Sequence, residues 1–349
     1  MIRFFDLFAG IGGFRSGLEA VGGFECVGHC EIDRYANQAY NAIYDIKPQE
    51  VYFEDVRKLD PNAMPDIDLI CGGFPCQSFS IAGLRRGFAD DARGTLFFEI
   101  ARIATVKRPA FLLLENVPGL LSHDQGRTFA AILAALDELG YDVAWQVLNS
   151  KDFGVPQSRK RVYLVGCLGD KCSGAILSFT EANGAAALQT SDGTQGRFFI
   201  DMNAEPKLTE AARCLTTRQD AGVVKRKGEH SGVFIEENPC AVLNPTKKSV
   251  RQNGRRIKEP DEPMFTLTVQ DRHGVVHRGR VRRLTPKECW RLQGFTDEQF
   301  HRAAATGLSG SRLYKMAGNA VSVPVISALG RKIKEIYERG RINAESCDQ

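Results

Sequence analysis

DLFAGIGGFRSGLEA, at residues 6–20, is the stretch that decides the fold. It continues an apolar run that begins at residue 2, passes through a glycine-rich turn and then takes on a helical pattern. A strand that enters a helix through such a turn is typical of α/β proteins that bind a nucleotide-like cofactor, because backbone N–H groups at the helix start face the ligand. The dinucleotide fingerprint needs a further glycine at position 15, where this chain carries Arg15, so the pattern disfavours NAD.

Short apolar segments alternate with helical patterns over the first half of the chain. The segments expected to be strands are 2–8, 26–32, 68–73, 110–117, 142–149 and 161–169. Residues 95–108 and 126–140 carry apolar residues at helical spacing, and the second stretch ends at a glycine C-cap. Alternating strands and helices predict a parallel sheet covered on both faces, with ligands at the carboxyl ends of the strands.

Two acidic residues lie where strands are expected to end. Glu31 lies about 20 residues beyond the glycine turn, the spacing at which dinucleotide-binding folds hold ribose hydroxyls, and Asp55 follows in FEDVRK. The glycines alone are better explained by a structural turn with incidental acids. Together with the two carboxylates, they favour a cofactor that carries a nucleoside without a pyrophosphate.

The loop after residues 68–73 carries Cys76 in the stretch FPCQSFS. Proline fixes φ and lacks an N–H, so Pro75 turns the chain and restricts Phe74. Cys76 is therefore expected at a fixed point above the carboxyl edge of the sheet, where cationic neighbours would lower its pKa and make it a nucleophile. Taken by itself, a cysteine after a proline fits a buried packing thiol better.

A carboxylic acid and two arginines complete the reactive side chains expected at this edge. An apolar strand delivers Glu115 at its end, where burial would raise the pKa of the carboxyl and make it a proton donor. Capping of the next helix is the alternative role. Arg159 and Arg161 are expected on the same side of an extended segment, where they would bind a carbonyl or a phosphate, or else form a solvated basic edge.

The chain divides by composition into three parts. Residues 170–280 are rich in Gly, Thr, Asn and charge, lack a sustained helical period, and predict an irregular second domain. Residues 171–282 carry 18 Lys and Arg against 13 Asp and Glu, whereas the rest of the chain carries 28 against 29. The run KKSVRQNGRRIK (247–258) fits a polyanionic partner or a solvated face. Residues 281–349 return to regular patterns and are expected to pack back on residues 1–169. In this part, LTPKECWRLQGF (284–295) predicts a helix that starts with a Thr cap and a Pro at its first position.

Composition disfavours several classes of protein. No segment approaches the roughly 18 apolar residues that span a bilayer, and the first residues do not read as a signal peptide, so a cytoplasmic protein is expected. Ten cysteines are too sparse for a disulfide scaffold and contain no CxxC pair. His29 beside Cys30 gives a weak hint of a metal, but without a second cluster at ligand spacing no metal is expected.

Seven motifs follow one another between residue 3 and about residue 330: DLFAGIGGF, CEID, GGFPCQSFS, ENV, QSRKR, RRLTPKECWRLQGF and GNAVSVPV. In this order they resemble the motifs of DNA (cytosine-5) methyltransferases, particularly the bacterial enzymes of restriction-modification systems. The resemblance implies the Rossmann-like α/β fold of S-adenosylmethionine-dependent methyltransferases, with a smaller, irregular target-recognition domain inserted. It places the catalytic and cofactor-binding domain at 1–169, target recognition at 170–280, and a segment that packs back on the catalytic domain at 281–349.

The resemblance also implies a role for individual residues. S-adenosylmethionine is expected against Gly10, Gly12, Phe14, Glu31, Ile32, Asp55, Val56, Pro75, Leu96, Asn319 and Val321. The implied catalytic residues are Cys76, Glu115, Arg159 and Arg161. Cys76 would attack carbon 6 of a cytosine flipped out of the duplex, so that carbon 5 takes the methyl group. Glu115 would contact ring nitrogen 3, and the arginines would lie near the base and its backbone.

The partner that the resemblance implies is double-stranded DNA, with a cognate restriction endonuclease as a separate functional partner that need not bind the protein. A monomer without membrane contact is expected. The implied DNA-reading residues are Thr266, Leu267, Arg255 and Arg256, although residues 214–217 match the family's Leu-Thr signature as well. The side chain that fills the gap left by the flipped base stays open, because Ala82 stands where some relatives carry a hydroxyl.

Three other functions compete with this interpretation. A tRNA cytosine-5 methyltransferase would share the architecture, but its Cys-Phe-Thr tripeptide is absent from the sequence. A DNA-binding autorepressor would need an added N-terminal helix-turn-helix, for which a first motif starting at residue 4 leaves no room. An amino-methyltransferase would need Asn-Pro-Pro-Tyr or a close variant where this chain has GFPCQ.

Overall fold

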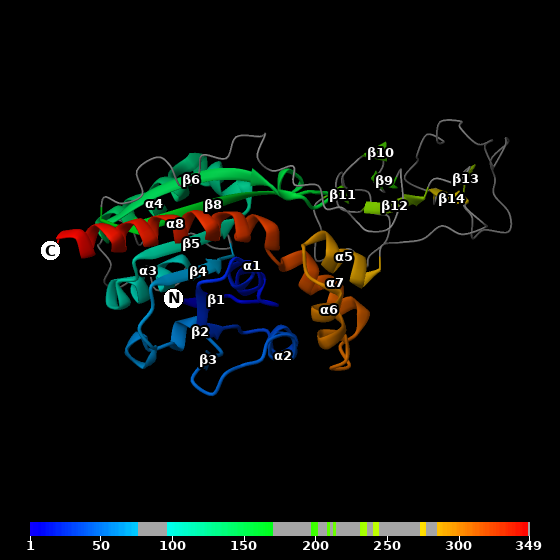
Figure 1. Ribbon diagram of the computed structural model, residues 1–349. Coiled ribbons are helices and arrows are strands. Elements are labelled where there is room, and N and C mark those ends of the chain that lie inside the picture. Colours follow the sequence, from blue (N-terminus) through cyan, green and yellow to red (C-terminus); the bar gives the residue numbers. More distant parts are fainter. Residues whose placement is uncertain are drawn as a thin grey trace.

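A seven-stranded sheet with the strand order β3-β2-β1-β4-β5-β8-β6 forms the centre of the protein (Figure 1). The computed structural model describes residues 1–75, 96–169 and 285–347, and the backbone of short strands between residues 197 and 276. The strands of the central sheet are β1 (Ile2–Leu7), β2 (Phe24–Cys30), β3 (Val51–Phe53), β4 (Leu69–Gly73), β5 (Phe111–Asn116), β6 (Tyr141–Asn149) and β8 (Lys160–Leu168).

Strand β8 runs antiparallel to both of its neighbours, β5 and β6, whereas the pairs among β1 to β5 are parallel. The expectation of a wholly parallel sheet is therefore wrong at this edge. The connection from β6 to β8, residues 150–159, is shorter than the crossover of about a dozen or more residues that parallel neighbours need. As a result, the start of β8 lies at the same edge of the sheet as the carboxyl ends of β4 and β5.

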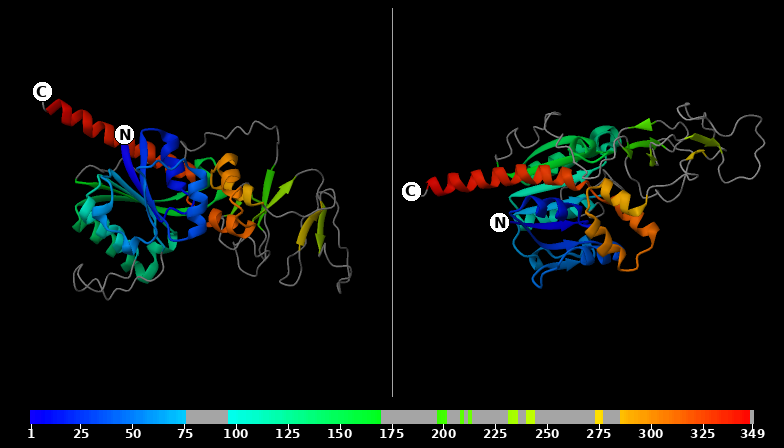
Figure 2. Two further views of the ribbon diagram at one scale, coloured as in Figure 1. Left: turned by 90° about the horizontal axis from the view of Figure 1, so that it is seen from below. Right: turned by 45° about the vertical axis from the view of Figure 1, so that its right-hand side comes forward.

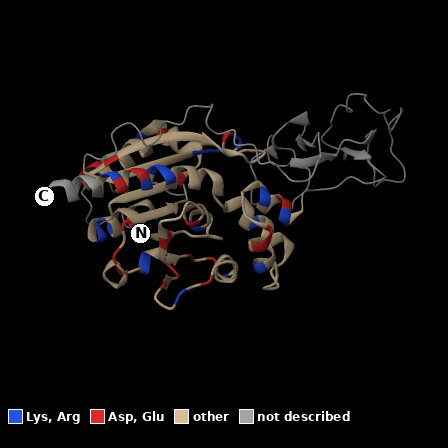
Figure 3. Ribbon diagram, viewed as in Figure 1, with Lys and Arg blue, Asp and Glu red and all other residues tan. Residues whose placement is uncertain are grey.

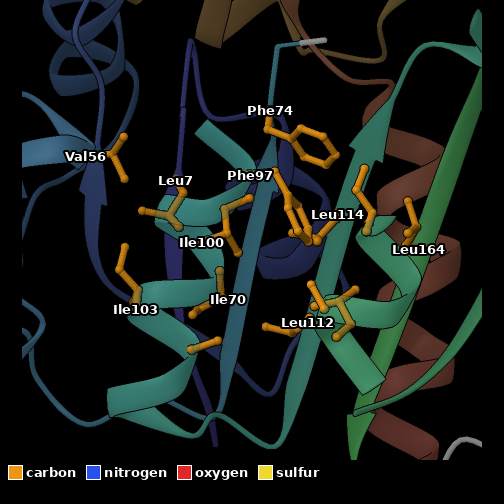
Figure 4. Packing of buried hydrophobic residues seen from close by; sticks show 14 of the residues in the cluster. Leu7, Val56, Ile70, Phe74, Phe97, Ile100, Ile103, Leu112, Leu114 and Leu164 are labelled. Carbon is orange, nitrogen blue, oxygen red and sulfur yellow. The ribbon is translucent and has the colours of Figure 1, made fainter. Parts of the chain in front are cut away.

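Helices cover both faces of the sheet, as expected (Figures 1 and 2). Helices α1 (Gly13–Val21) and α8 (Val323–Cys347) cover one face, and α3 (Leu96–Lys107) and α4 (Arg127–Glu138) cover the other. Strand β5 shows how alternating side chains serve both layers. Leu112 and Leu114 belong to the cluster with α3 and α4 (Figure 4), whereas Phe111 and Leu113 pack with α1 and α8.

A separate group of helices packs against the end of the sheet domain. It consists of α5 (Pro286–Leu292), α6 (Asp297–Ala304) and α7 (Gly310–Asn319), and it shares a core around the buried Trp290 with α2 (Arg34–Ile43). The predicted start of α5 is confirmed: Thr285 caps the helix in a capping box with Glu288, and Pro286 takes its first turn. Short 3-10 helices lie at Val56–Lys58, Pro61–Ala63, Pro118–Leu121, His123–Gly126 and Ser150–Phe153.

The strands described between residues 197 and 276 lie beyond α5 to α7 (Figure 1). They are β9 (Arg197–Asp201), β10 (Leu208–Thr209), β11 (Ala212–Arg213), β12 (Ser231–Ile235), β13 (Cys240–Leu243) and β14 (His273–Val276). They form a β10-β9-β12 sheet and a β13-β14 pair, while β11 pairs in parallel with β7 (Gln157–Ser158).

Charges of both signs are mixed over the outer helices. Along α8, both basic and acidic residues are present (Figure 3). Among the described residues, no helix is long and apolar enough to cross a membrane.

Candidate active site

A cavity of about 760 Å³ opens where β1, β2, β4 and β5 end, and α7 closes its other side. Among the residues expected at the site, those that line the cavity are Gly10, Phe14, Glu31, Ile32, Pro75, Glu115, Arg159, Arg161, Asn319 and Val321. Gly12, Asp55, Val56 and Leu96 do not line it. The sheet edge and α7 therefore bring seven of the expected cofactor residues into one cavity with Glu115, Arg159 and Arg161.

Glu31, directly after β2, is fixed by backbone groups from two directions. Gly10 N–H donates to its Oε2 at 2.7 Å, and Asp33 N–H donates to its Oε1 at 2.7 Å. Burial raises the pKa of the Glu31 carboxyl, and these two hydrogen bonds act against that rise. Each carboxylate oxygen has a second lone pair left to accept a bond, so the group can receive a pair of hydroxyls.

Apolar side chains lie beside this carboxyl. Ile32 is 60% exposed, an unusual position for an isoleucine and one that offers a surface to a flat apolar ligand. Phe14, in the first turn of α1, lines the cavity and also belongs to the core cluster of α1 and α8. Packing in this core therefore fixes where Phe14 lies in the cavity wall.

The glycine turn between β1 and α1 rests on Tyr44. Gly12 has φ of +75°, and a Cβ there would lie 2.4 Å from the Tyr44 ring, so only glycine fits. The Tyr44 hydroxyl lies 2.6 Å from the Gly12 carbonyl oxygen and 2.6 Å from Ser16 Oγ. The Arg15 guanidinium lies 4.6 Å from the centre of the Tyr44 ring and pairs with Glu50 at 2.7 Å. Arg15 thus supports the turn indirectly, through its contact with the Tyr44 ring.

Three of the residues that do not line the cavity serve as local supports. Asp55 caps the 3-10 helix Val56–Lys58 and pairs with Arg57 at 2.8 Å, and Arg57 lowers the pKa of the Asp55 carboxyl. Val56 is buried in the core beneath α3, and Leu96 begins α3 and packs on the same core. A role for these residues in cofactor binding stays a prediction.

The chain leaves β4 toward Cys76 beside Glu115. Gly73, the last residue of β4, pairs in register with Glu115 on β5. Asn116 Nδ2 donates to the Phe74 carbonyl oxygen at 2.8 Å, and this buried bond fixes the direction in which the chain leaves the sheet. Pro75 lines the cavity. Cys76 itself, like Ala82, lies outside the described residues.

Glu115 forms a close ion pair inside the cavity. Arg161 Nε lies 3.0 Å from Glu115 Oε1, and both side chains are largely buried. Burial raises the pKa of Glu115, and the charges of Arg161 and Arg159 counteract the rise without cancelling it. The predicted direction of this pKa shift is thus confirmed, and the group is suited to hold a proton.

Arg159 lies just before β8 and is only 2% exposed. Its Nη2 donates to the carbonyl oxygens of Gly318 at 3.2 Å and Ala320 at 2.9 Å. These carbonyls belong to the segment that carries Asn319 and Val321 into the cavity. The two arginines therefore share the cavity but have different partners: Arg161 contacts the carboxyl, and Arg159 supports the opposite wall.

A family model described as C-5 cytosine-specific DNA methylase matches residues 2–335 of this sequence, which is nearly all of it. The chain belongs to this family. The resemblance stated from the seven motifs is thereby confirmed, and so is the α/β fold of this class.

Relatives of this methylase match it over most of their length. Orphan methyltransferase M.SPRI of Bacillus phage SPR is 33% identical, with 99% of each chain covered. Type II methyltransferase M.NlaX of Neisseria lactamica is 37% identical, with 96% of each covered. Type II methyltransferase M.SsoII of Shigella sonnei is 36% identical over 95% of this chain and 79% of its own.

Solved structures share the fold of this methylase at lower sequence identity. The S. pombe Dnmt2 methyltransferase superposes with a TM-score of 0.62 at 18% identity, covering 97% of this chain and 99% of that one. A putative DNA modification methyltransferase encoded within an E. coli prophage gives a TM-score of 0.57 at 20% identity, covering 97% of this chain and 100% of that one. Identities this low establish a common fold alone.

The methylase cavity also has a basic rim that the sequence did not reveal. Lys315 pairs with Asp33 at 2.9 Å, and the Arg312 guanidinium lies 3.3 Å from the centre of the Tyr35 ring. Arg34 contacts the same ring, at 4.5 Å from its centre. Asp33, the last residue of CEID, carried a recognisable signal as a helix cap. Arg312 and Lys315 carried none, because the short α7 was not predicted.

The DNA-reading residues expected in the methylase, Thr266, Leu267, Arg255 and Arg256, lie outside the described residues, as does the competing stretch 214–217. Their roles stay predictions. Strand β11 immediately precedes residue 214 and pairs with β7. Gln157 of β7 lies two residues before Arg159.

Proposed function

We propose that this methylase transfers a methyl group to carbon 5 of cytosine in double-stranded DNA, with S-adenosylmethionine as the donor. The observation that carries the proposal is the Glu115–Arg161 pair, which lies beside the chain leading to Cys76 and in the same cavity as Glu31. A proton-holding carboxyl, a nucleophile position and a hydroxyl-binding acid are the groups that this reaction requires together.

The cavity fits a cofactor that contains adenosine. Glu31 has lone pairs for both ribose hydroxyls, and the exposed Ile32 offers an apolar face to the base. Phe14, Pro75, Asn319 and Val321 would enclose the remainder. When bound, S-adenosylmethionine supplies an electrophilic methyl group on a sulfonium sulfur. We assign Gly10, Gly12, Asp55, Val56 and Leu96 to the support of the same site.

Cys76 and Glu115 act on different atoms of the cytosine ring. The Cys76 thiolate adds to carbon 6, and Glu115 delivers a proton at ring nitrogen 3, so that negative charge does not build up in the ring. Carbon 5 then carries the electron pair and takes the methyl group. Loss of the carbon 5 proton to a base, return of the nitrogen 3 proton to Glu115 and departure of the thiolate restore the aromatic ring and the starting state of the protein. The target cytosine must be flipped out of the duplex to reach these side chains. Arg161 would then hold both the Glu115 carboxyl and the oxygen of the base in place.

The covalent step is tested by substitution of Cys76. DNA carrying 5-fluorocytosine keeps the adduct, because fluorine at carbon 5 cannot leave as the proton does. The wild-type protein should form a denaturation-stable complex with such DNA in the presence of the cofactor, and Cys76→Ser should bind the DNA without forming it. Cys289→Ser, at a buried thiol on α5, is the control and should form the adduct normally. Adduct formation by Cys76→Ser would rule out this nucleophile.

We further propose that residues 170–280 form the target-recognition domain, between the catalytic domain 1–169 and the packing segment 281–349. Methylation then protects host DNA from a cognate endonuclease, as the names of the type II relatives suggest, whereas the name of the orphan relative in phage SPR suggests activity without one. Expression in a methylation-free host followed by base-resolution mapping of 5-methylcytosine should show one modified DNA sequence. Methylated tRNA with unmodified DNA would favour the RNA alternative.

A further inference from the structure

Four polar side chains meet in a buried cluster that adjoins the segments carrying Arg159 and Asn319 to the cavity. They are Ser150 and Gln157 from the connection before β8, Gln293 after α5, and Ser322 before α8, and none is more than 1% exposed. We call this cluster the amide clasp. Three segments that are far apart in the sequence are joined by it, although none of its four members lines the cavity.

Gln293 is the centre of the amide clasp. Its Nε2 donates to the Ala317 carbonyl oxygen at 2.6 Å. Its Oε1 accepts from Gln157 Nε2 at 3.2 Å and from Ser322 Oγ at 3.1 Å. Its backbone oxygen accepts from Val323 N–H at 2.8 Å. One residue therefore holds the segment 317–323 at both ends and is itself held by the segment that precedes Arg159.

The two hydroxyls extend the clasp back to the start of β8. Ser150 Oγ lies 2.6 Å from Ser322 Oγ, and the Ser150 backbone N–H donates to the Arg159 carbonyl oxygen at 3.0 Å. Ser150 Oγ also lies 3.2 Å from the Arg159 carbonyl oxygen, and its single proton can serve only one of these two acceptors. If Ser150 donates to Ser322, Ser322 can donate to Gln293, and the Arg159 carbonyl oxygen still accepts from the Ser150 backbone N–H. Arg159 reaches the same segment from the other side, at Gly318 and Ala320.

The backbone around Gln293 leaves little freedom for another arrangement. Gly294 has φ of +88°, and a Cβ there would lie 2.5 Å from Pro324 Cδ. Burying polar groups costs free energy unless all of them are paired, and a satisfied network fixes one arrangement more strictly than an apolar contact does. An apolar residue at position 293 would fill the space without fixing the segment 317–323.

We infer that Gln293 is a positioning residue that couples the cofactor half of the cavity to the base half. The segment it holds carries Asn319 and Val321 on the cofactor side, and its partner Gln157 in β7 shortly precedes Arg159 and Arg161 on the base side. Occupation of one half therefore orders the other. This inference rests on the proposed function, because it assigns the two halves to the cofactor and to the flipped base.

The test is Gln293→Met, which keeps the length and volume of the side chain but removes its hydrogen bonds. Calorimetry would give the Kd of S-adenosylhomocysteine for the full chain, alone and with sheared, unmethylated genomic DNA. Loss of buried hydrogen bonds of this kind should weaken binding at least about fivefold. The effect of DNA on the Kd, and of the cofactor on DNA affinity, should shrink together, because coupling between two ligands is reciprocal.

Tyr141→Phe is the matched control. The Tyr141 hydroxyl is also buried and donates to a backbone carbonyl, that of Pro109 at 2.8 Å, but it lies at the end of β6 away from the cavity. This variant should lose stability and keep both the Kd and the coupling. Ser322→Ala removes a single bond from the clasp and should give an intermediate loss, which keeps the inference testable if Gln293→Met does not fold.

Two outcomes separate the inference from the proposed function. If the wild-type protein binds neither S-adenosylhomocysteine nor DNA, the proposed function is wrong. If the wild-type protein binds both with measurable coupling, and Gln293→Met or Ser322→Ala retains the same Kd and coupling as Tyr141→Phe, the amide clasp does not connect the two halves and the inference is overturned.

Discussion

The Glu115 carboxyl experiences two opposed influences on its proton. Burial removes water from the charged form and raises the pKa of Glu115, while the guanidinium of Arg161, 3.0 Å away, and that of Arg159 lower it. Burial is the larger effect, so the carboxyl keeps its proton to a higher pH than an exposed glutamate does. Arg161 meanwhile fixes its orientation toward the cavity.

The pH dependence of turnover should report this proton. Because the protonated form is the donor, we expect wild-type turnover to fall as the pH rises through the raised pKa of Glu115. Glu115→Gln should lower turnover by roughly 100-fold or more and abolish this alkaline fall, since an amide releases no proton to the ring. Initial rates of methyl transfer from a labelled cofactor, measured as a function of pH, test both effects.

Glu99→Gln provides the control for this substitution. Glu99 is also buried and ion-paired, with Arg102 at 2.7 Å, but it lies on α3 and does not line the cavity. Its substitution should leave the pH profile unchanged. An alkaline fall that persists in Glu115→Gln would assign the proton to another group.

For individual residues, the sequence predicted which side chains line the cavity. It predicted their hydrogen-bond partners less well. Glu31, Glu115 and Arg161 line the cavity because each is adjacent to, or within, a strand whose end could be recognised. Arg159 was expected on the same side as Arg161, but it precedes β8, where strand alternation does not apply. Its carbonyl partners at Gly318 and Ala320 lie far away in the sequence, so local pattern carries no information about them.

The turn between β1 and α1 is the element on which the cofactor half of the cavity is built. Tyr44, after α2, presses its ring against Gly12 and bonds the carbonyl there, and Arg15 stacks on the outer face of that ring. The turn is therefore held by a neighbouring element as well as by its own hydrogen bonds. Any substitution that displaces the Tyr44 ring should therefore change the affinity for a ligand that binds at the turn.

Gly12→Ala should show this support. An alanine at positive φ costs about 1–2 kcal/mol wherever it occurs, but at Gly12 the new methyl group also collides with the Tyr44 ring. We expect affinity for S-adenosylhomocysteine to fall about tenfold or more, equivalent to about 1.4 kcal/mol. Gly307→Ala has a similar φ of +80° with nothing within 4 Å, and should lose stability without losing affinity. Equal affinities for the two variants would contradict a role for Tyr44.

Elements with a local signature were predicted well, and those set by distant pairing were not. The helices α3 and α4 and the capped start of α5 follow from spacing and caps. The direction of β8 depends on its hydrogen bonds to β5 and β6, which no local period encodes. The three-residue β3 and the short α7 offer too few residues for a period to appear.

On the scale of the whole molecule, the basic run at residues 247–258 and the cavity belong to different parts of the chain. Helix α8 carries both basic and acidic residues, whereas residues 247–258 carry six basic residues and no acid. A nucleic acid that spans both parts would neutralise the charge of residues 247–258 with its phosphates and present a base to the cavity. DNA affinity and cofactor affinity should therefore respond separately to charge substitutions.

Neutralising two arginines of the basic run tests this separation. In Arg255→Gln with Arg256→Gln, the slope of log affinity for DNA against log salt should fall by about 0.9 for each phosphate that the protein no longer neutralises, because fewer counterions are released. The Kd of S-adenosylhomocysteine should stay unchanged. Lys332→Gln with Lys334→Gln, on α8, removes the same charge and should leave the slope unaltered. A slope that does not move in the first variant would place the phosphate-binding residues elsewhere.

The packing of α8 on α1 also has a consequence for how the protein is made. Phe14 and Leu18 of α1 share their core with Val325, Ile326, Leu329 and Ile333 of α8. At about 5–20 residues per second, the ribosome needs about 15–60 s to synthesise the residues that separate these helices. Throughout that interval one face of the nascent sheet lacks its final cover, and it becomes a natural place for a chaperone to bind.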